Sequence, residues 1–278
     1  MRSLEGKVAV VTGSAGGIGV PLVEVLTQEG CRVALVDKDE DAVRAQAAAL
    51  KSYGHVVSVH VLDVRDNAGL EQLVPEIEAI HGGCDLLVCS AGVTVHGPFS
   101  RHTADDIDWL LDTNLRSLVQ TCRVFLPLLR RSSGAHVVLL SSMTGLFGTP
   151  TESLYSASKH GVLGFGHALR TECAPLGIGV TTVLPGAVAT LFVANGRARD
   201  PEGVAMLVPM IARHGLRPER LASKIVSAIK KNKREISVGV DARFVRLVQW
   251  VAPWFLHRVL AFVYRRYTPG GTLDGEMD

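Results

Sequence analysis

A run of apolar residues that gives way to glycines and then to a helical pattern constrains this chain more than any other feature. Residues 7–12 form an apolar strand pattern, and Gly13, Gly17, Ile18 and Gly19 follow it. Glycine permits backbone angles that other residues disfavour and lets the main chain approach a ligand, while the N–H groups at a helix start attract phosphate. The sequence therefore predicts a strand, a glycine turn and a helix that hold a dinucleotide pyrophosphate.

A second apolar run, over residues 31–37, ends in Asp37, eighteen residues beyond Gly19. An acid at about this distance in a β-α-β unit accepts hydrogen bonds from the ribose hydroxyls of a dinucleotide. Its charge would also repel the 2′-phosphate of NADP, and Lys38 is the only cation nearby. We therefore expect NAD as the cofactor, with NADP as the disfavoured alternative.

Strand-like apolar runs alternate with helical patterns along most of the chain. Strands are predicted at 7–12, 31–37, 55–62, 84–89, 135–141, 178–184 and 235–239, and helices at 17–29, 39–53, 67–81, 103–131 with a break near Asp112, 152–175 and 217–231. Strands this apolar are typical of a parallel sheet covered on both faces. The pattern predicts an α/β fold with a doubly wound, Rossmann-like sheet of about seven strands, whose ligand crevice lies at the carboxyl ends of the strands.

Composition excludes several classes of protein. The net charge of +2, with no zinc-finger spacing and no basic-aromatic run, gives no reason to expect nucleic acid. The five cysteines are odd in number and scattered, and no CxxC, HExxH or other metal-ligand spacing is present, so we expect reduced core cysteines and no metal site. The first strand begins too early to leave room for a signal peptide, which favours a cytoplasmic location.

One pair of residues predicts acid/base chemistry. Tyr155 and Lys159 stand four apart in a predicted helix, so their side chains share one face. A tyrosine is a poor base because its ordinary pKa is about 10, but an adjacent ammonium group stabilises the phenolate and lowers that pKa. Such a pair can remove the proton of an alcohol, and Ser142, after the strand 135–141, can hydrogen-bond the same oxygen. The alternative for the pair alone is two exposed side chains on a helix surface.

These motifs, in this order, resemble the short-chain dehydrogenase/reductase family over roughly residues 5–240. The matching residues are Thr12-Gly13 through Gly17-Ile18-Gly19, Asp63-Val64, Ala91-Gly92, Asn114, Ser142, Tyr155 with Lys159, and Pro185-Gly186 with Thr190. The resemblance implies that Tyr155 is the acid and base and that Lys159 lowers its pKa and binds the nicotinamide ribose. It further implies that Ser142 orients the substrate oxygen and that Asn114 holds a water in a proton relay.

The resemblance also implies contacts with the cofactor beyond the glycine turn. Asp63 and Val64 would contact the adenine, and Ala91 and Gly92 would lie near the ribose. The nicotinamide carboxamide would contact the Val188 backbone and Thr190, with Pro185 and Gly186 beside them. Relatives that prefer NADP usually carry Arg or Lys just before Gly17, where this chain has Gly16. Cys89-Ser90 replaces the family's Asn-Asn, a change that bears on sheet stability more than on chemistry.

The connection 186–215 is long for a compact domain and is predicted to form a substrate lid. Its apolar residues, and three that follow the catalytic serine, predict a hydrophobic pocket: Leu191, Phe192, Val193, Met206, Leu207, Val208, Met210, Ile211, Met143, Leu146 and Phe147. We therefore expect an NAD-dependent enzyme that interconverts a hydrophobic secondary alcohol and its ketone, of steroid, retinoid, fatty or terpenoid type. The alternatives are an NADPH-linked ketoreductase and a catalytically idle, cofactor-sensing or membrane-tethered binding protein.

The last predicted unit is an amphipathic extension over 241–278, which follows a catalytic domain over 1–240. Positions 243, 246 and 249 are polar and share one helical face, and Pro253 suits the first turn of a second helix. No stretch is long and apolar enough to span a bilayer. Residues 243–266 therefore either pack on the body or on a sister subunit of a homodimer or homotetramer, or lie on a membrane as basic aromatic helices do. We favour packing.

Overall fold

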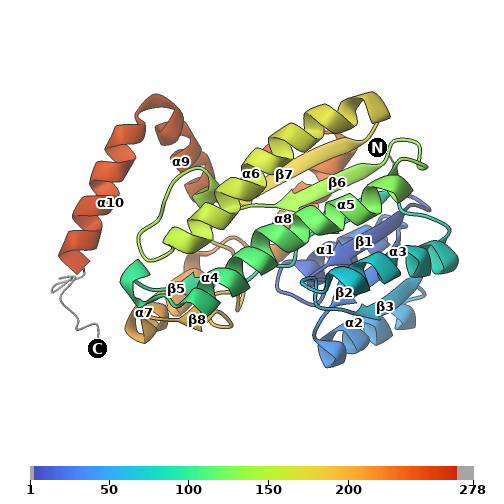
Figure 1. Cartoon of the computed structure of the whole chain (residues 1–278), viewed down its shortest axis with the longest axis horizontal. Helices are drawn as coiled ribbons and strands as arrows, with labels where there is room; N and C mark the ends of the chain where they lie inside the picture. The colour runs from blue at the N-terminus through green and yellow to red at the C-terminus, as the bar shows by residue number, and fades with distance from the viewer. Residues whose placement is uncertain (1–2, 268–278) are drawn as a thin grey trace.

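The computed structural model describes residues 3–267 of the chain. Its centre is a parallel sheet of seven strands in the order β3-β2-β1-β4-β6-β7-β9 (Figure 1). The strands are β1 (Val8–Thr12), β2 (Arg32–Asp37), β3 (Val57–Val61), β4 (Leu86–Cys89), β6 (His136–Leu140), β7 (Gly179–Pro185) and β9 (Glu235–Val238). Each begins and ends within two residues of its predicted range, so the structure confirms the doubly wound parallel sheet.

Helices cover both faces of the sheet. One face carries α1 (Gly19–Gln28), α2 (Glu40–Ser52) and α8 (Pro218–Lys230), and the other carries α3 (Asn67–His81), α5 (Ser117–Leu129) and α6 (Ser153–Cys173) (Figure 1). Every residue of β1, β4 and β6 is buried, which is why these strands are continuous apolar runs. Strand β1 pairs with β2 on one side and with β4 on the other, so the order in which the strands are added reverses at β1. In such folds ligands bind at this point, beside the carboxyl ends of the strands.

The predicted break near Asp112 is a π-helical segment. Helix α4 (Ala104–Leu111) continues through Asp112–Arg116, which has π geometry, into α5. A capping box starts α4, in which the side chains of Thr103 and Asp106 each accept a hydrogen bond from the other residue's backbone. Single π turns are rare and frequently occur at functional sites. Asn114 lies within this one.

The predicted lid has structure of its own. Residues 186–215 contain β8 (Arg197–Ala198) and α7 (Pro201–His214), and β8 pairs in parallel with β5 (Val95–His96). The sequence predicted neither this two-stranded sheet nor the helix. The pairing ties the lid to the segment that follows β4, so the lid lies beside the carboxyl edge of the main sheet.

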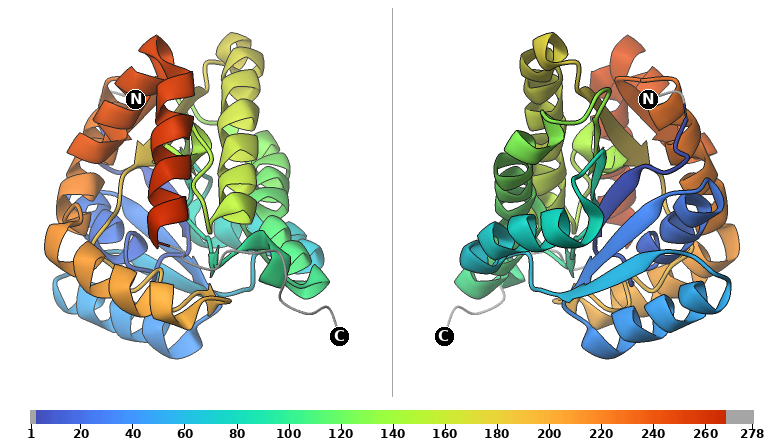
Figure 2. Two further views of the ribbon diagram at one scale, coloured as in Figure 1. Left: turned by 90° about the vertical axis from the view of Figure 1, so that its left-hand side faces the viewer. Right: turned by 90° about the vertical axis from the view of Figure 1, so that its right-hand side faces the viewer.

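After β9 the chain forms two further helices, α9 (Val240–Val251) and α10 (Pro253–Tyr267). Pro253 begins the second helix as predicted, and the two helices form a hairpin at one end of the molecule, where α10 runs beside α6 (Figure 2). Residues 268–278 of the predicted extension lie outside the described residues. Short 3-10 turns occur at Phe99–Arg101, Met143–Gly145 and Ala174–Leu176. All five cysteines are buried and free, as predicted.

Candidate active site

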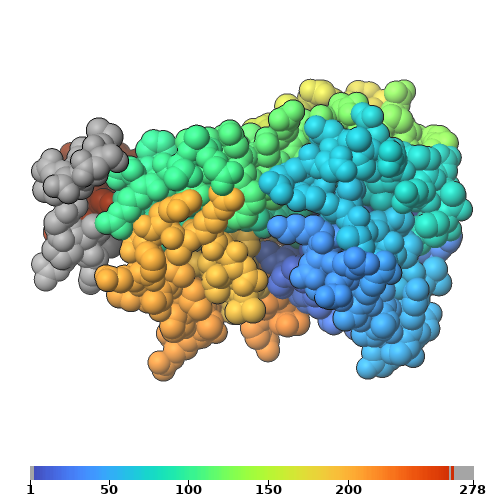
Figure 3. Space-filling view, turned by 60° about the horizontal axis from the view of Figure 1, so that its bottom comes forward, coloured from blue at the N-terminus to red at the C-terminus, as the bar shows by residue number. Residues whose placement is uncertain are grey.

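The predicted site residues meet at the carboxyl edge of the sheet. Gly13 follows β1, Asp37 ends β2, Asp63 and Val64 follow β3, Ala91 and Gly92 follow β4, Ser142 follows β6, and Pro185 ends β7 with Gly186 after it. Tyr155 and Lys159 lie in the first two turns of α6, and Asn114 lies in the π segment. The surface is hollowed between the lid, gold to orange, and the N-terminal segments, blue (Figure 3).

The glycine turn has no room for side chains. Gly13 has a φ of +66°, and a Cβ there would lie 2.7 Å from the Ala91 Cα. A Cβ at Gly17 would lie 2.6 Å from the Thr190 Cβ, and one at Gly19 would overlap the Gly13 carbonyl. The turn therefore requires glycine at all three positions, and the lid residue Thr190 lies directly over it.

The acid predicted to bind ribose faces this turn. One oxygen of Asp37 accepts a hydrogen bond from the Ala15 N–H at 3.0 Å, and the other accepts one from the Asp39 N–H at 3.1 Å. A strand-end carboxylate beside a close-packed glycine turn is what the ribose and pyrophosphate of a dinucleotide require, so these residues fit such a cofactor. Whether a phosphate on that ribose is excluded stays a prediction.

Asp63 has a partner that the sequence did not predict. Arg65 lies 2.7 Å from its carboxylate and donates hydrogen bonds to both oxygens. These bonds hold the pKa of Asp63 below its usual value. Its predicted contact with adenine, like that of the buried neighbour Val64, stays a prediction, but Arg65 now belongs to the same corner of the site.

Helix α6 brings the side chains of Tyr155 and Lys159 close together. The Lys159 Nζ lies 5.5 Å from the centre of the Tyr155 ring and donates a hydrogen bond to the Leu140 carbonyl at 2.9 Å. The Ser142 Oγ accepts the Thr144 N–H at 3.2 Å, and the Ser142 side chain acts to lower the pKa of Tyr155. Gly92 lies beside this ammonium, since a Cβ there would be 3.6 Å from the Lys159 Nζ. The geometry brings Ser142, Tyr155 and Lys159 together as predicted, while their roles stay predictions.

Burial shifts the pKa values of the ionisable groups in this pocket. It raises the pKa of Tyr155, the Glu152 carboxylate adds to the rise, and the Ser142 side chain opposes it. That Lys159 lowers the Tyr155 pKa stays a prediction. Burial also lowers the pKa of Lys159 to about 8, because a desolvated ammonium loses its proton more readily. Glu152, which the sequence analysis missed, has its pKa raised to about 7 by burial.

Asn114 positions the loop that follows β4. Its side-chain oxygen accepts the Val93 N–H at 2.8 Å, and its amide donates to the Val93 carbonyl at 2.9 Å and to Ser158 at 3.2 Å. The side chain is fully buried, so these bonds are shielded from water. The amide thereby joins the π segment, the Ala91-Gly92 loop and the catalytic helix.

The lid is fastened by an ion-pair cluster that sequence reasoning missed. Asp106 is fully buried and contacts Arg197 at 2.9 Å and Arg199 at 2.7 Å, one residue on each side of Ala198 in β8. The guanidinium of Arg197 also lies over the Trp109 ring, 4.2 Å from its centre. These bonds hold the pKa of Asp106 far below its usual value. The alternation Arg-Ala-Arg was the available signal, because alternate residues of a strand point to one side.

The predicted apolar pocket is reduced by the C-terminal hairpin. Leu146 and Phe147 follow the catalytic serine, but they pack against Val245 and Leu256 of α9 and α10 instead of facing open space. Phe192 of the lid does reach the site, with its ring 5.8 Å from that of Tyr155. On α7, the Met206 and Met210 side chains are more than half exposed, and their part in an apolar lining stays a prediction.

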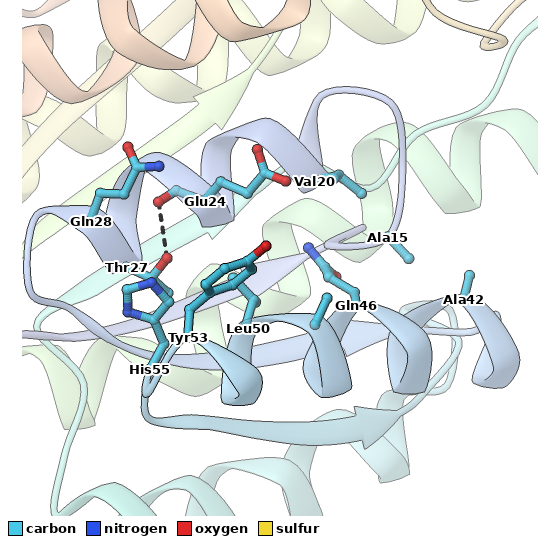
Figure 4. Close-up of a pocket in the computed structure, with 11 residues that line it drawn as sticks. Ala15, Val20, Glu24, Thr27, Gln28, Ala42, Gln46, Leu50, Tyr53 and His55 are labelled. Carbon is cyan, nitrogen blue, oxygen red and sulfur yellow. Dashed lines mark hydrogen bonds between the residues drawn. The ribbon is translucent and has the colours of Figure 1, made fainter.

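A separate cavity of about 610 Å³ lies between α1 and α2 (Figure 4). Its lining includes Glu24, Gln46, Tyr53 and His55, and it reaches the glycine turn only at Ala15. None of the residues predicted to perform the chemistry lines it. The catalytic crevice and this cavity are therefore distinct.

Comparisons with known proteins show what this chain is similar to. A model of the family described as short chain dehydrogenase matches residues 7–201. "Probable oxidoreductase EphD" of Mycobacterium tuberculosis is 33% identical over 252 residues, a match that covers 87% of this chain but only 43% of that relative's length. "C alpha-dehydrogenase" of Sphingobium sp. is 28% identical, with 91% of this chain and 89% of the relative covered. The solved structure of a short chain dehydrogenase/reductase from Burkholderia phymatum in complex with NAD is 26% identical, has a TM-score of 0.83, and is matched over 89% of this chain and 94% of that one.

Proposed function

Because the chain belongs to the short-chain dehydrogenase family, we propose that it is an NAD-dependent oxidoreductase that interconverts a hydrophobic secondary alcohol and its ketone. The observation that carries the proposal is the meeting of Ser142, Tyr155 and Lys159 beside a glycine turn with no room for side chains. A catalytically idle binding protein would have no need to bury a lysine next to a tyrosine at this cost in desolvation.

The chain's own residues account for the movement of the proton. In the oxidising direction the Tyr155 oxygen takes the hydroxyl proton of the alcohol, and Ser142, whose side chain acts on the pKa of that tyrosine, holds the substrate oxygen. Lys159 keeps a positive charge near the ring and so opposes the effect of burial. When bound, the nicotinamide accepts or returns the hydride, and its oxidised form is positively charged. Phe192 and Thr190 close the site from the lid side.

The preference for NAD rests on Asp37. A 2′-phosphate would have to lie beside a carboxylate that already accepts two backbone hydrogen bonds. The relative solved with NAD is consistent with this choice. The hydrophobic substrate class rests on Phe192 and on the apolar Met143 turn beside the catalytic serine. The name of the Sphingobium relative, a dehydrogenase, supports the oxidising direction.

A direct assay tests the proposal. The protein is mixed with NAD and a panel of hydrophobic secondary alcohols, and NADH absorbance is followed, with short polar alcohols as the control. We expect kcat/KM to favour NAD over NADP by at least about tenfold, equivalent to about 1.4 kcal/mol, and Asp37→Ala to narrow the ratio. Equal or reversed preference would favour the NADPH-linked alternative. Cofactor binding without turnover in either direction would favour a binding protein.

A further inference from the structure

The α9–α10 hairpin has two faces, and only one of them has a partner among the described residues. The inner face contributes Val245, Val248, Leu256 and Leu260, which pack against the turn and loop after Ser142. At its start, Asp241 accepts a hydrogen bond from the Ala187 N–H at 2.9 Å, which fixes α9 to the base of the lid. The hairpin is therefore attached to the body, as the favoured sequence interpretation expected for this face.

The outer face exposes large apolar side chains. On α9 these are Phe244, Leu247, Trp250 and Val251, between 59% and 84% exposed, and on α10 they are Trp254, Phe255, Val259 and Phe262, between 39% and 67% exposed. Positions 244, 247 and 251 share one side of α9, and 255, 259 and 262 share one side of α10, because residues three, four and seven apart align on a helix. When exposed apolar side chains lie together on the surface of a soluble protein, the patch they form marks an interaction site.

The charge around this face is positive. Residues 240–267 contain five Arg and one acid, Asp241, whose carboxylate is already bonded to the backbone. Among the Arg side chains that the structure describes on the hairpin, only Arg246 forms an ion pair, with Glu235. Arg243 and Arg265 are exposed, and Arg258 lies over the Trp254 ring at 5.3 Å. The outer face is thus aromatic and basic together.

We propose that this outer face docks on an anionic lipid surface. Tryptophan and phenylalanine bury their rings at the boundary between headgroups and acyl chains, and arginines beside them attract anionic headgroups. A second copy of the chain is a poorer occupant, because a two-fold contact sets the same patch against itself and brings like charges together. None of the helices between residues 3 and 267 combines the length and apolar character that a bilayer crossing requires.

A cavity of about 640 Å³ lies between α10 and the start of α6, lined by Pro150, Ala157, His160, Leu260 and Tyr264 among others. Ala157 is two residues from Tyr155, and side chains two apart on a helix point to opposite sides. This cavity is therefore separate from the crevice at Tyr155.

Cosedimentation of the full chain with vesicles tests the proposal. We expect binding to vesicles of phosphatidylcholine mixed with phosphatidylserine, much weaker binding to phosphatidylcholine alone, and a blue shift of tryptophan emission on binding. The double variant Phe244→Ser/Trp250→Ser should reduce the bound fraction at least about tenfold, and Arg243→Gln/Arg265→Gln should reduce binding only to the anionic vesicles. Tyr53→Ser is the matched control, because Tyr53 is 80% exposed and lies on the body.

Three outcomes would overturn the proposal. The full chain could stay in the supernatant with anionic vesicles, or the Phe244→Ser/Trp250→Ser variant could bind as well as the unmodified protein. Analytical ultracentrifugation could instead show a dimer that this variant dissociates, with no vesicle binding, which would assign the face to a second copy. Unchanged melting temperatures of all variants show that they are folded, and vesicle binding needs no turnover, so failure of the proposed function is a separate result.

Discussion

Helices α6 and α7 both serve the crevice, yet they are held in opposite ways. Eight residues of α6 are buried, including Lys159 and the core residue Val162, whereas α7 has no buried residue at all. The helix that carries Tyr155 and Lys159 is embedded in the core. The helix that belongs to the lid lies on the surface.

The bonds that hold the two regions differ in kind as well. Lys159 bonds the Leu140 carbonyl, and Ser141 donates to the Lys159 carbonyl at 2.8 Å, so α6 is joined directly to the sheet. The lid is joined through Asp106 and its two arginines, and through a strand pair only two residues long. The difference teaches that Tyr155 and Lys159 are held in place by the core, while the predicted lid depends on a small number of polar contacts that can separate.

The largest effect on turnover should come from a change in the buried helix α6. Tyr155→Phe removes only the ionisable oxygen, so turnover should fall by at least about 1,000-fold, within the range for loss of an acid/base group. NAD binding, measured by calorimetry, should stay nearly unchanged. Retention of a large fraction of turnover would contradict the mechanism.

A matched pair of truncations measures the difference in packing. Val162→Ala on α6 should lower the free energy of unfolding in urea by about 2 kcal/mol, because it removes buried methyl groups and leaves a cavity. Met210→Ala on α7 should change it by less than about 0.5 kcal/mol, since that side chain is 53% exposed. If the two variants lost similar amounts of unfolding free energy, α6 and α7 would not differ in how tightly they are packed.

The polar attachment of the lid is tested by Asp106→Asn. The change keeps the size of the side chain but removes the charge that holds Arg197 and Arg199, so KM should rise by about tenfold while kcat changes less than about twofold. Cleavage within 186–215 in limited proteolysis should become faster. Glu71→Gln, which breaks an exposed pair with Arg123, is the control and should leave KM unchanged.

The smallest effect concerns pH. Glu152 has a pKa of about 7, so above that pH its negative charge raises the pKa of Tyr155 and delays formation of the phenolate. Glu152→Gln removes this charge, so the rising limb of the pH profile of kcat/KM for alcohol oxidation should move to lower pH by roughly half a unit. A limb that moves to higher pH would show that Glu152 acts on the site in another way.

The sequence predicted the sheet because buried parallel strands must be apolar, and the seven runs stand out for that reason. It also predicted which side chains meet at the edge, since glycines, Asp37 and Ser142 follow strands and Tyr155 and Lys159 share a helix face. The break at Asp112 was visible because the helical pattern there is too long for one regular helix.

The rest depends on contacts between segments far apart in the chain. Asp106 and Arg199 are 93 residues apart, so the alternation Arg-Ala-Arg places the two arginines on one side of a strand but does not identify Asp106 as their partner. The same holds for Phe147 and Leu256, whose contact removes part of the predicted pocket. The spacing shows that Lys159 is near Tyr155, but it does not show that burial raises the pKa of Tyr155 and lowers that of Lys159.

The π segment at Asp112–Arg116 joins α4 to α5, and its length sets how far α4 is rotated about the helix axis relative to α5. Helix α4 carries Asp106 toward the lid, and α5 packs on the sheet. One residue of helix corresponds to a rotation of about 100°, so deleting a single residue here would keep α5 in place and turn α4 by more than a quarter of a circle. Asp106 would then face away from its arginines. The length of this segment, as much as the identity of Asn114, decides whether the lid meets the site.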